Sequence, residues 1–256
     1  MSRHTRLTLR TIPILFSMAL MTSCGVQNKE SRVDYTRNAI TDELKSDTGI
    51  EAFITPYKKH VDSIMDSPIS YNPTLLTKTD TPLNTALGNL MARAVYEQAQ
   101  PVYKSRTGHD IDFVLLNHGG IRSTLNPGPV TTRSAYQLMP FENEIVVTEL
   151  TRDSIQSLID YLVEKKRAHP IEGLQLALNS QGKLTSILVN KQPLQDRTYR
   201  VATSDYLQQG GDRMTFFGNP VSMERVDYKI RNALLDYFKR QDTIRNVADN
   251  RFIQTQ

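Results

Sequence analysis

The chain has 256 residues, of which 39% are hydrophobic and 23% are charged, and its formal net charge is +4. This length fits one globular domain, or one domain with a tether. Cys24 is the only cysteine, which excludes an intramolecular disulfide. The charge is small and forms no basic stripe, so we expect no nucleic-acid partner.

The first 23 residues are typical of a secretory signal peptide. A basic start with three arginines precedes an apolar run from Ile12 to Met21, and Thr22-Ser23-Cys24 follows. About ten apolar residues are too few to span a bilayer, which needs roughly twenty. We expect cleavage before Cys24 and lipid attachment to its sulfur, although Met21 stands where leucine is commoner in a bacterial lipobox. The alternative is an ordinary signal peptide with an incidental cysteine.

Cleavage before Cys24 would leave 233 of the 256 residues and remove three positive charges, so the mature chain would be close to +1. Residues 24–45 are polar and poor in apolar side chains, which predicts a linker between the lipid and the fold. Residues 46–256 are then the folded domain. The expected location is the bacterial cell envelope, after export from the cytoplasm and with a lipid anchor in the membrane.

Two helices and two strands are predicted in the first part of the domain. Residues 47–65 carry apolar side chains near helical spacing, which predicts a helix. A second helix is predicted to begin at Thr81, as N-cap, with Pro82 at the first helical position. Residues 112–117 and 144–150 are rich in apolar and β-branched side chains, which predicts strands.

The second part of the domain mixes helices and strands. Thr151 is the predicted cap of a helix whose apolar residues recur at helical spacing from Ile155 onward. Three strands are predicted at 174–178, 184–190 and 198–204, in the manner of a meander, and a last helix near 224–240. This order predicts an α+β fold with a mixed β-sheet flanked by helices.

Two glycine pairs follow predicted strands. Asn117-His118-Gly119-Gly120-Ile121-Arg122 comes after an apolar run, and Gly210-Gly211 closes a second segment that begins about ninety residues later at Ser204. Glycine is used where the backbone takes a positive φ or approaches another group closely. Because both segments place polar or aromatic side chains beside the glycines, we expect a binding site at the rim of one sheet.

These segments resemble the C-terminal domain of the bacterial and animal 5′-nucleotidases, the UDP-sugar hydrolase family, from about Leu75 to Phe238. Each marker is weak alone, but five occur in order at sensible spacing. The resemblance implies that this domain recognises the substrate and that a separate N-terminal domain performs the chemistry. The markers are Leu87-Gly88-Asn89-Leu90, the segment 117–122, Met139-Pro140-Phe141-Glu142-Asn143, Tyr199-Arg200-Val201-Ala202-Thr203, and Asp205-Tyr206 through Gly210-Gly211-Asp212.

The resemblance implies a base-binding end of the site. Phe141 and Tyr206 match the two walls of an aromatic clamp, and Asn117 matches a residue that hydrogen-bonds the base. Stacking on a base contributes roughly 1–3 kcal/mol and tolerates different bases. The alternatives are that the two aromatic side chains belong to the core and that Asn117 only caps the glycine turn.

The resemblance also implies a ribose and phosphate end. Asp212 matches a carboxylate that accepts hydrogen bonds from the ribose hydroxyls, and Arg122 matches a residue that grips the phosphate side. Asp212 alternatively only forms a turn, and Arg122 is alternatively a solvated charge. We expect His118 to be a turn residue. The four glycines would let the backbone approach the ligand: Gly119, Gly120, Gly210 and Gly211.

The chain departs from the family pattern mainly at the phosphate end. Arg93 stands near the place of a usual acidic residue, and Lys78 is the nearest cation where a further arginine is usual. Arg213 follows Asp212 where a small residue is usual. The base and ribose end therefore matches the family more fully than the phosphate end.

Hydrolysis in this family requires two metal ions, which clamp the attacking and leaving oxygens. The family binds them with Asp-x-His, Gly-Asp, Gly-Asn-His and Gly-His-x-His motifs. This sequence contains none of the three motifs with histidine, and its one Gly-Asp pair is Gly211-Asp212 of the second glycine segment. His109, Asp110 and Asp112 are expected to form a loop at a strand start and not a metal site. We therefore expect no catalytic residue, metal or cofactor in this chain, with divalent metals only in a partner metallophosphatase.

Three functions remain open. The chain could be the substrate-binding half of a split 5′-nucleotidase, whose catalytic half is a separate metallophosphatase that could share the same membrane. It could instead capture nucleosides or nucleotides for uptake or sensing, or be a structural envelope lipoprotein that has lost the ligand. The first is favoured because the predicted pocket is complete on the base side and incomplete on the phosphate side.

Overall fold

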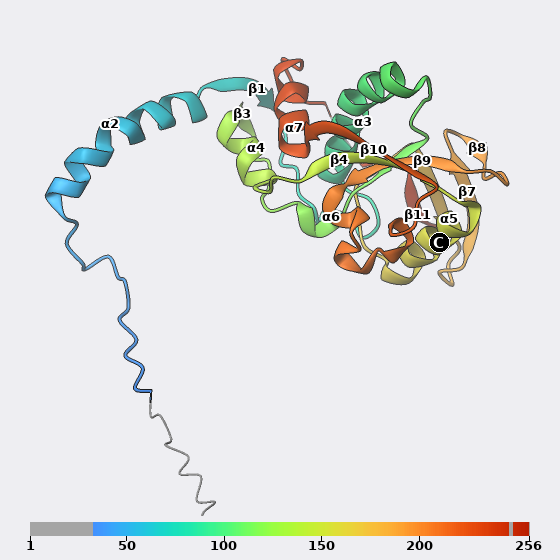
Figure 1. Cartoon of the computed structure of the whole chain (residues 1–256), viewed down its shortest axis with the longest axis horizontal. Helices are drawn as coiled ribbons and strands as arrows, with labels where there is room; N and C mark the ends of the chain where they lie inside the picture. The colour runs from blue at the N-terminus through green and yellow to red at the C-terminus, as the bar shows by residue number, and fades with distance from the viewer. Residues whose placement is uncertain (1–32, 246–247, 256) are drawn as a thin grey trace, which may run out of the picture. The chain divides into compact units, whose positions relative to one another are not determined.

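The structure is a computed structural model that describes residues 33–245 and 248–255. The predicted signal peptide and lipidation site at Cys24 lie outside these residues. The chain divides into two units, residues 1–51 and 52–256, and the described residues 33–47 of the first are all exposed. Elements carry the labels of Figure 1. Among the described residues, no helix combines the length and apolar character needed to cross a bilayer.

The first predicted helix is confirmed as α2 (Thr48–Met65). The Asp47 carboxylate accepts hydrogen bonds from the amides of Gly49 and Ile50 at 2.9 and 3.0 Å, which satisfies amides of the first turn. None of the α2 side chains is buried. The helical spacing of its apolar residues therefore predicts the helix correctly without marking a core face.

The predicted start of the second helix at Thr81 and Pro82 is wrong. Helix α3 (Ala86–Thr107) has Thr85 as its N-cap, whose hydroxyl accepts from the Gly88 amide at 3.1 Å. Just before the helix, the Asn84 side chain donates to the carbonyl oxygen of Asp249 at 3.0 Å, a residue 165 positions away. This tertiary contact holds the preceding segment outside the helix, so the cap falls four residues later.

The central layer is a mixed sheet of five strands in the order β10-β4-β9-β2-β5. Strands β9 and β2 are parallel, and the other neighbours are antiparallel. This confirms the predicted α+β fold with a mixed sheet. The strands span Ser222–Lys229 (β10), Glu144–Leu150 (β4), Tyr199–Ser204 (β9), Phe113–Leu115 (β2) and Ile171–Glu172 (β5).

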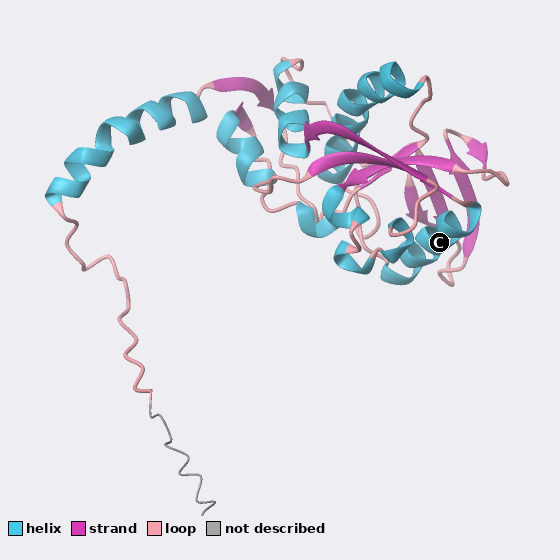
Figure 2. Ribbon diagram, viewed as in Figure 1, coloured by secondary structure: helices cyan, strands magenta, loops and turns pink. Residues whose placement is uncertain are grey.

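Helices cover both faces of this sheet, as Figures 1 and 2 show. Alternate strand residues point to opposite faces, so Val114 enters one core while Phe113 and Leu115 enter the other. The first core lies under α3 and the helices α4 (Thr132–Leu138) and α7 (Ile230–Lys239). The second lies under α5 (Arg152–Lys165), which begins at the predicted cap Thr151.

A second sheet of four strands has the order β11-β6-β7-β8. The predicted strands at 174–178 and 184–190 are β6 (Leu174–Leu178) and β7 (Leu184–Val189), paired antiparallel. The third strand of the predicted meander, β9, instead joins the five-stranded sheet. Prediction missed several short elements: β1 (Pro68–Asn72), β3 (Gly128–Thr131), β5, β8 (Gln192–Pro193), β11 (Phe252–Gln254), α4 and α6 (Asp205–Gln208).

The predicted helix at 224–240 is half wrong. Residues 222–229 form β10, and only 230–239 are helical. Glu224 pairs with Val147 of β4. Asp227 has φ of 56°, a left-handed value that interrupts a right-handed helix. Val226 is buried as the spacing suggests, but it enters the core from a strand.

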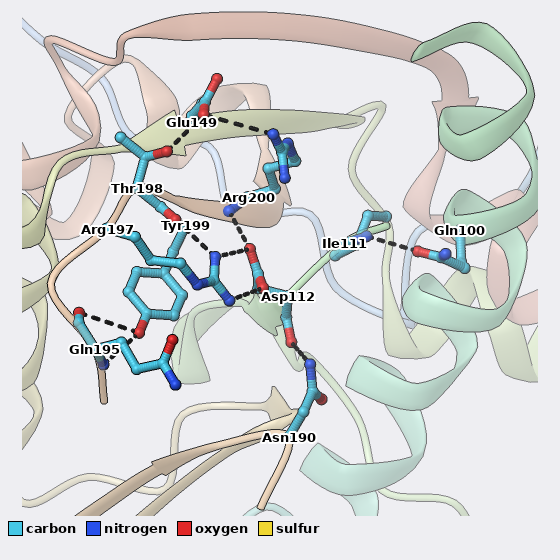
Figure 3. A network of polar contacts seen from close by, with 10 residues as sticks. All are labelled: Gln100, Ile111, Asp112, Glu149, Asn190, Gln195, Arg197, Thr198, Tyr199 and Arg200. Carbon is cyan, nitrogen blue, oxygen red and sulfur yellow. Dashed lines mark hydrogen bonds and ion pairs between the residues drawn. The ribbon is translucent and has the colours of Figure 1, made fainter. Parts of the chain in front are cut away.

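A network of polar contacts centred on Asp112 fixes the start of β2 (Figure 3). The Asp112 carboxylate accepts from the Arg197 guanidinium at 2.6 and 3.2 Å and from the Arg200 amide at 2.8 Å. Its carbonyl oxygen accepts from Asn190 at 2.9 Å. Residues 109–112 form a loop before a strand, as predicted, and Asp112 ties that strand to β9 and to the turn after β7.

Candidate functional site

Three segments meet at one edge of the five-stranded sheet. The parallel strands β2 and β9 pair at Val114 and Ala202, so the residues that follow both strands emerge at the same edge. Strand β4 runs antiparallel to β9, with Ile145 opposite Ser204, so the loop before β4 lies there as well. This confirms the prediction that the two glycine segments lie at the rim of one sheet. Crevices at the carboxyl ends of parallel strands are common ligand sites.

A cavity of about 380 Å³ opens at this edge. Phe141 and Tyr206 both line it and are 40% and 45% exposed, so neither belongs to the core. Gly210 and Gly211 do not line it. The remaining seven predicted site residues do: Asn117, Gly119, Gly120, Arg122, Phe141, Tyr206 and Asp212. Met139 and Asn143, for which no role was predicted, line it as well.

The loop that carries Phe141 is held from α7. The buried side chain of Arg231 donates to Glu142 and to the carbonyl oxygen of Phe141, the latter at 3.4 Å. Lys229 donates to the other oxygen of Glu142. Hydrogen bonds from Lys229 and Arg231 lower the pKa of Glu142 to about 2, so it is ionised at neutral pH. These contacts hold the backbone at Phe141 and Glu142, while the Phe141 ring remains 40% exposed.

Tyr206 lies in the short helix α6, directly after β9. A Cβ added to Gly211 would lie 2.5 Å from two carbons of the Tyr206 ring. Gly211 therefore lets the ring lie flat against the backbone, and Gly210 makes the preceding turn with φ of 89°. The second glycine pair therefore leaves room for the Tyr206 ring and does not itself line the cavity.

Asp205 connects the two aromatic walls. One oxygen of its carboxylate accepts from the Tyr206 amide at 2.8 Å. The same oxygen accepts from the Asn143 side chain at 3.1 Å and from the Glu144 amide at 3.2 Å, both in the segment after Phe141. The sequence contained Asp205 within a family marker but gave it no role. Its contacts are tertiary, and only Asn143, beside Phe141 in a second marker, offered a signal for them.

Asp212 is the polar centre of the cavity. Its two carboxylate oxygens accept from Asn117 Nδ2 at 2.7 Å and from the Tyr206 hydroxyl at 3.0 Å. Tyr161 donates to its carbonyl oxygen at 3.0 Å. Its φ of 52° is left-handed. Each carboxylate oxygen has a second lone pair, so Asp212 can still accept hydrogen bonds from a ligand.

Asn117 does not cap the glycine turn that follows it. The turn His118–Gly120 has no side-chain cap hydrogen bond, and the Asn117 amide is directed at Asp212 instead. Gly120 is required beside it, because a Cβ there would lie 2.8 Å from Asn117 Oδ1. His118 is in this turn, as predicted, and its Nδ1 lies 3.1 Å from the carbonyl oxygen of Ala168.

Cationic side chains lie on the side of the first glycine pair. The Arg122 guanidinium carbon is 5.8 Å from the Phe141 ring centroid. Lys78 donates to the carbonyl oxygen of Ile121 at 2.7 Å. Burial, with the charges of Arg122 and Arg167, lowers the pKa of Lys78. The cavity therefore combines aromatic walls, one carboxylate and a positive end.

Within residues 33–245 and 248–255, no group of three or more His, Cys, Asp or Glu side chains is placed to hold a metal ion. Arg93, which departs from the family pattern, donates to Glu172 at 3.0 Å. It does not line the cavity.

Comparisons with known proteins agree on one family. Residues 71–219 match the family described as 5'-nucleotidase, C-terminal domain. The chain is 25% identical over 236 residues to a 5'-nucleotidase of Vibrio vulnificus (strain CMCP6), which covers 87% of this chain and 39% of that protein. It is 33% identical over 115 residues to Protein UshA of Salmonella pullorum, covering 42% of this chain and 20% of that protein.

The fold is also that of a solved structure. The 5'-nucleotidase precursor from Thermus thermophilus superposes with a TM-score of 0.67 and 22% identity, covering 80% of this chain and 43% of that chain. The chain thus spans less than half the length of each of these three relatives. The family match covers more than half of the chain. This chain belongs to the 5'-nucleotidase C-terminal domain family.

Proposed function

We propose that this chain is the substrate-recognition component of a 5′-nucleotidase-type hydrolase in nucleotide catabolism. The observation that carries the proposal is the cavity at the sheet edge, where two exposed aromatic rings face a shared space with a carboxylate and an arginine. A planar base fits between Phe141 and Tyr206, because stacking needs only ring faces that are accessible. Hydrogen bonds to the backbone of both residues support the segments that carry the two rings.

Each polar group of the cavity binds a different part of the nucleotide in this proposal. Asp212 accepts hydrogen bonds from the two ribose hydroxyls, and Arg122 meets the phosphate side. Asn117 holds Asp212 through Nδ2 at 2.7 Å, which leaves its Oδ1 for the edge of the base. Gly119 and Gly120 place backbone, without side chains, beside the ligand.

The metal chemistry in this proposal belongs to a separate metallophosphatase. This sequence contains none of the histidine-containing metal-binding motifs that the family resemblance predicts for hydrolysis. Divalent metals bound in the partner would activate the attacking water and stabilise the leaving oxygen. Lipid attachment at Cys24 would place the chain in the cell envelope, where co-anchoring to one membrane raises the effective concentration of the two proteins.

Membrane extracts of a strain that lacks this gene test whether this chain binds the substrate while a separate metallophosphatase hydrolyses it. Adding the purified protein is expected to lower the Michaelis constant for Mn²⁺-dependent AMP hydrolysis by about tenfold. The reason is that the complex gains the free energy of stacking the base on the aromatic rings, which corresponds to an effect of about this size. The protein alone should release no phosphate from AMP. Phe141→Ala protein is the matched control and should have little effect.

No change in the Michaelis constant at saturating protein would contradict the split hydrolase. If the same protein still binds AMP, that result would favour the alternative, a non-catalytic nucleoside- or nucleotide-binding envelope lipoprotein. Metal-dependent AMP hydrolysis by the protein alone would contradict the proposal that catalysis belongs to a separate metallophosphatase.

A further inference from the structure

A second cavity, of about 340 Å³, lies next to the first. The two share Gly119 and Asp212 as lining residues. Its other walls come from His118, from Tyr161 and Lys165 near the end of α5, from the loop residues Arg167 and His169, and from Arg213. No family marker of the sequence accounts for these α5 and loop residues.

His169 lines this cavity and is itself buried. The residue is 6% exposed and its Nδ1 accepts from the His118 amide at 3.2 Å, so the hydrogen of the neutral ring is on Nε2. Within the described part of the chain, Nε2 has no hydrogen-bond partner. Burial, with the charge of His118, lowers the pKa of His169 to about 4, so the ring is neutral at physiological pH. A ligand that supplies an acceptor would satisfy this donor.

The charges around the cavity are mostly positive. Three cationic side chains line it, Lys165, Arg167 and Arg213. Neither arginine forms an ion pair within residues 33–245 and 248–255, whereas Lys165 pairs with Glu164 at 2.7 Å. Burial lowers the pKa of both His118 and His169, and the charge of Arg167 adds to the effect on each ring.

One carboxylate lines this cavity, that of Asp212. Both of its oxygens already accept hydrogen bonds from residues that line the first cavity, Asn117 and Tyr206. The group that Tyr161 contacts is the backbone carbonyl of Asp212, at 3.0 Å. The second cavity therefore offers a buried neutral donor and two guanidinium groups, a combination that suits a multiply charged oxyanion.

We propose that the second cavity binds a phosphate group carried on the 2′ or 3′ oxygen of the ribose. The inference rests on the proposed function, because Asp212, which is common to both cavities, is the proposed partner of the ribose hydroxyls. A phosphate on one of those oxygens extends past Asp212 toward His169 and Arg167. The ligands that fill both cavities are nucleoside 3′- or 2′-monophosphates and 3′,5′-bisphosphates.

Calorimetric titrations with adenosine, adenosine 3′-monophosphate and inorganic phosphate test this subsite in the full mature protein. The 3′-monophosphate is expected to bind at least about tenfold more tightly than adenosine, through charge-assisted hydrogen bonds. Arg167→Gln should remove this gain and leave adenosine affinity unchanged. Arg152→Gln makes the same charge change on α5, outside both cavities, and should keep the gain.

A nitrogen-15 spectrum of the histidine side chains gives a second readout that needs no variant. The His169 Nε2 resonance is expected to shift with the 3′-monophosphate and not with adenosine. The proposal is overturned if the 3′-monophosphate binds no more tightly than adenosine, if the gain survives in Arg167→Gln, or if inorganic phosphate alone binds as tightly. Arg167-dependent binding of the 3′-monophosphate without any adenosine binding would support the subsite and overturn the nucleoside pocket.

Discussion

Replacing Phe141 with alanine is expected to weaken adenosine binding by about 1–3 kcal/mol, equivalent to roughly 5- to 150-fold in Kd. The ring lines the cavity and is held by its backbone, because Arg231 contacts Glu142 and the Phe141 carbonyl oxygen. Those contacts do not involve the ring, so the loop should keep its place and the loss should report stacking. Isothermal titration calorimetry measures the effect.

Phe53→Ala is the matched control for that substitution. Phe53 is 70% exposed on α2 and does not line the cavity. Its replacement should leave adenosine affinity unchanged. Wild-type affinity in Phe141→Ala, or an equal loss in Phe53→Ala, would contradict the clamp. Tyr206→Phe further separates the ring of Tyr206 from its 3.0 Å hydrogen bond to Asp212.

Replacing Asp112 with alanine is expected to lower the free energy of unfolding by about 2–4 kcal/mol. Its carboxylate is 12% exposed and accepts from the Arg197 guanidinium and from the Arg200 amide. Removing it leaves the Arg200 amide without a partner and frees the β2–β9 connection seen in Figure 3. Urea unfolding followed by circular dichroism measures the change.

Asp110→Ala is the control for charge. Asp110 lies two residues earlier and pairs with Lys104 at 2.8 Å, but both side chains are mostly exposed. Exposed ion pairs contribute little to stability, so the urea midpoint should barely move. Asp112→Asn keeps one acceptor oxygen, so its urea midpoint should lie between those of Asp110→Ala and Asp112→Ala. Equal midpoints for Asp110→Ala and Asp112→Ala would show that the network does not stabilise the fold.

The sequence predicted elements well where local signals and burial agree. The strands at 144–150 and 174–178 match β4 and β6, and Thr151 caps α5 as expected. Prediction from the sequence failed where a contact with a residue far along the chain determines the local secondary structure. The contact between Asn84 and Asp249 moves the start of α3 past Thr81, and pairing with β4 makes a strand of 224–229.

In the candidate site, too, residues carried by local motifs were predicted, and residues that act through tertiary contacts were not. Residues within the two glycine segments and the loop of Phe141 were found because motifs carry them, and the parallel pairing of β2 with β9 brings them together. Asp205 and His169 were not found. Asp205 acts through bonds to Asn143 and Glu144, and His169 through the His118 amide, 51 residues away. Apart from the place of Asn143 in a family marker, such contacts leave no signal in one sequence.

A crystal structure of the protein with AMP tests the central claim most directly. We predict that the base lies between the rings of Phe141 and Tyr206, with the ribose hydroxyls within hydrogen-bond distance of the Asp212 carboxylate and the phosphate toward Arg122. A base bound outside the cavity at the ends of β2 and β9, or no bound nucleotide at saturating AMP, would contradict the proposed recognition of nucleotides by this domain.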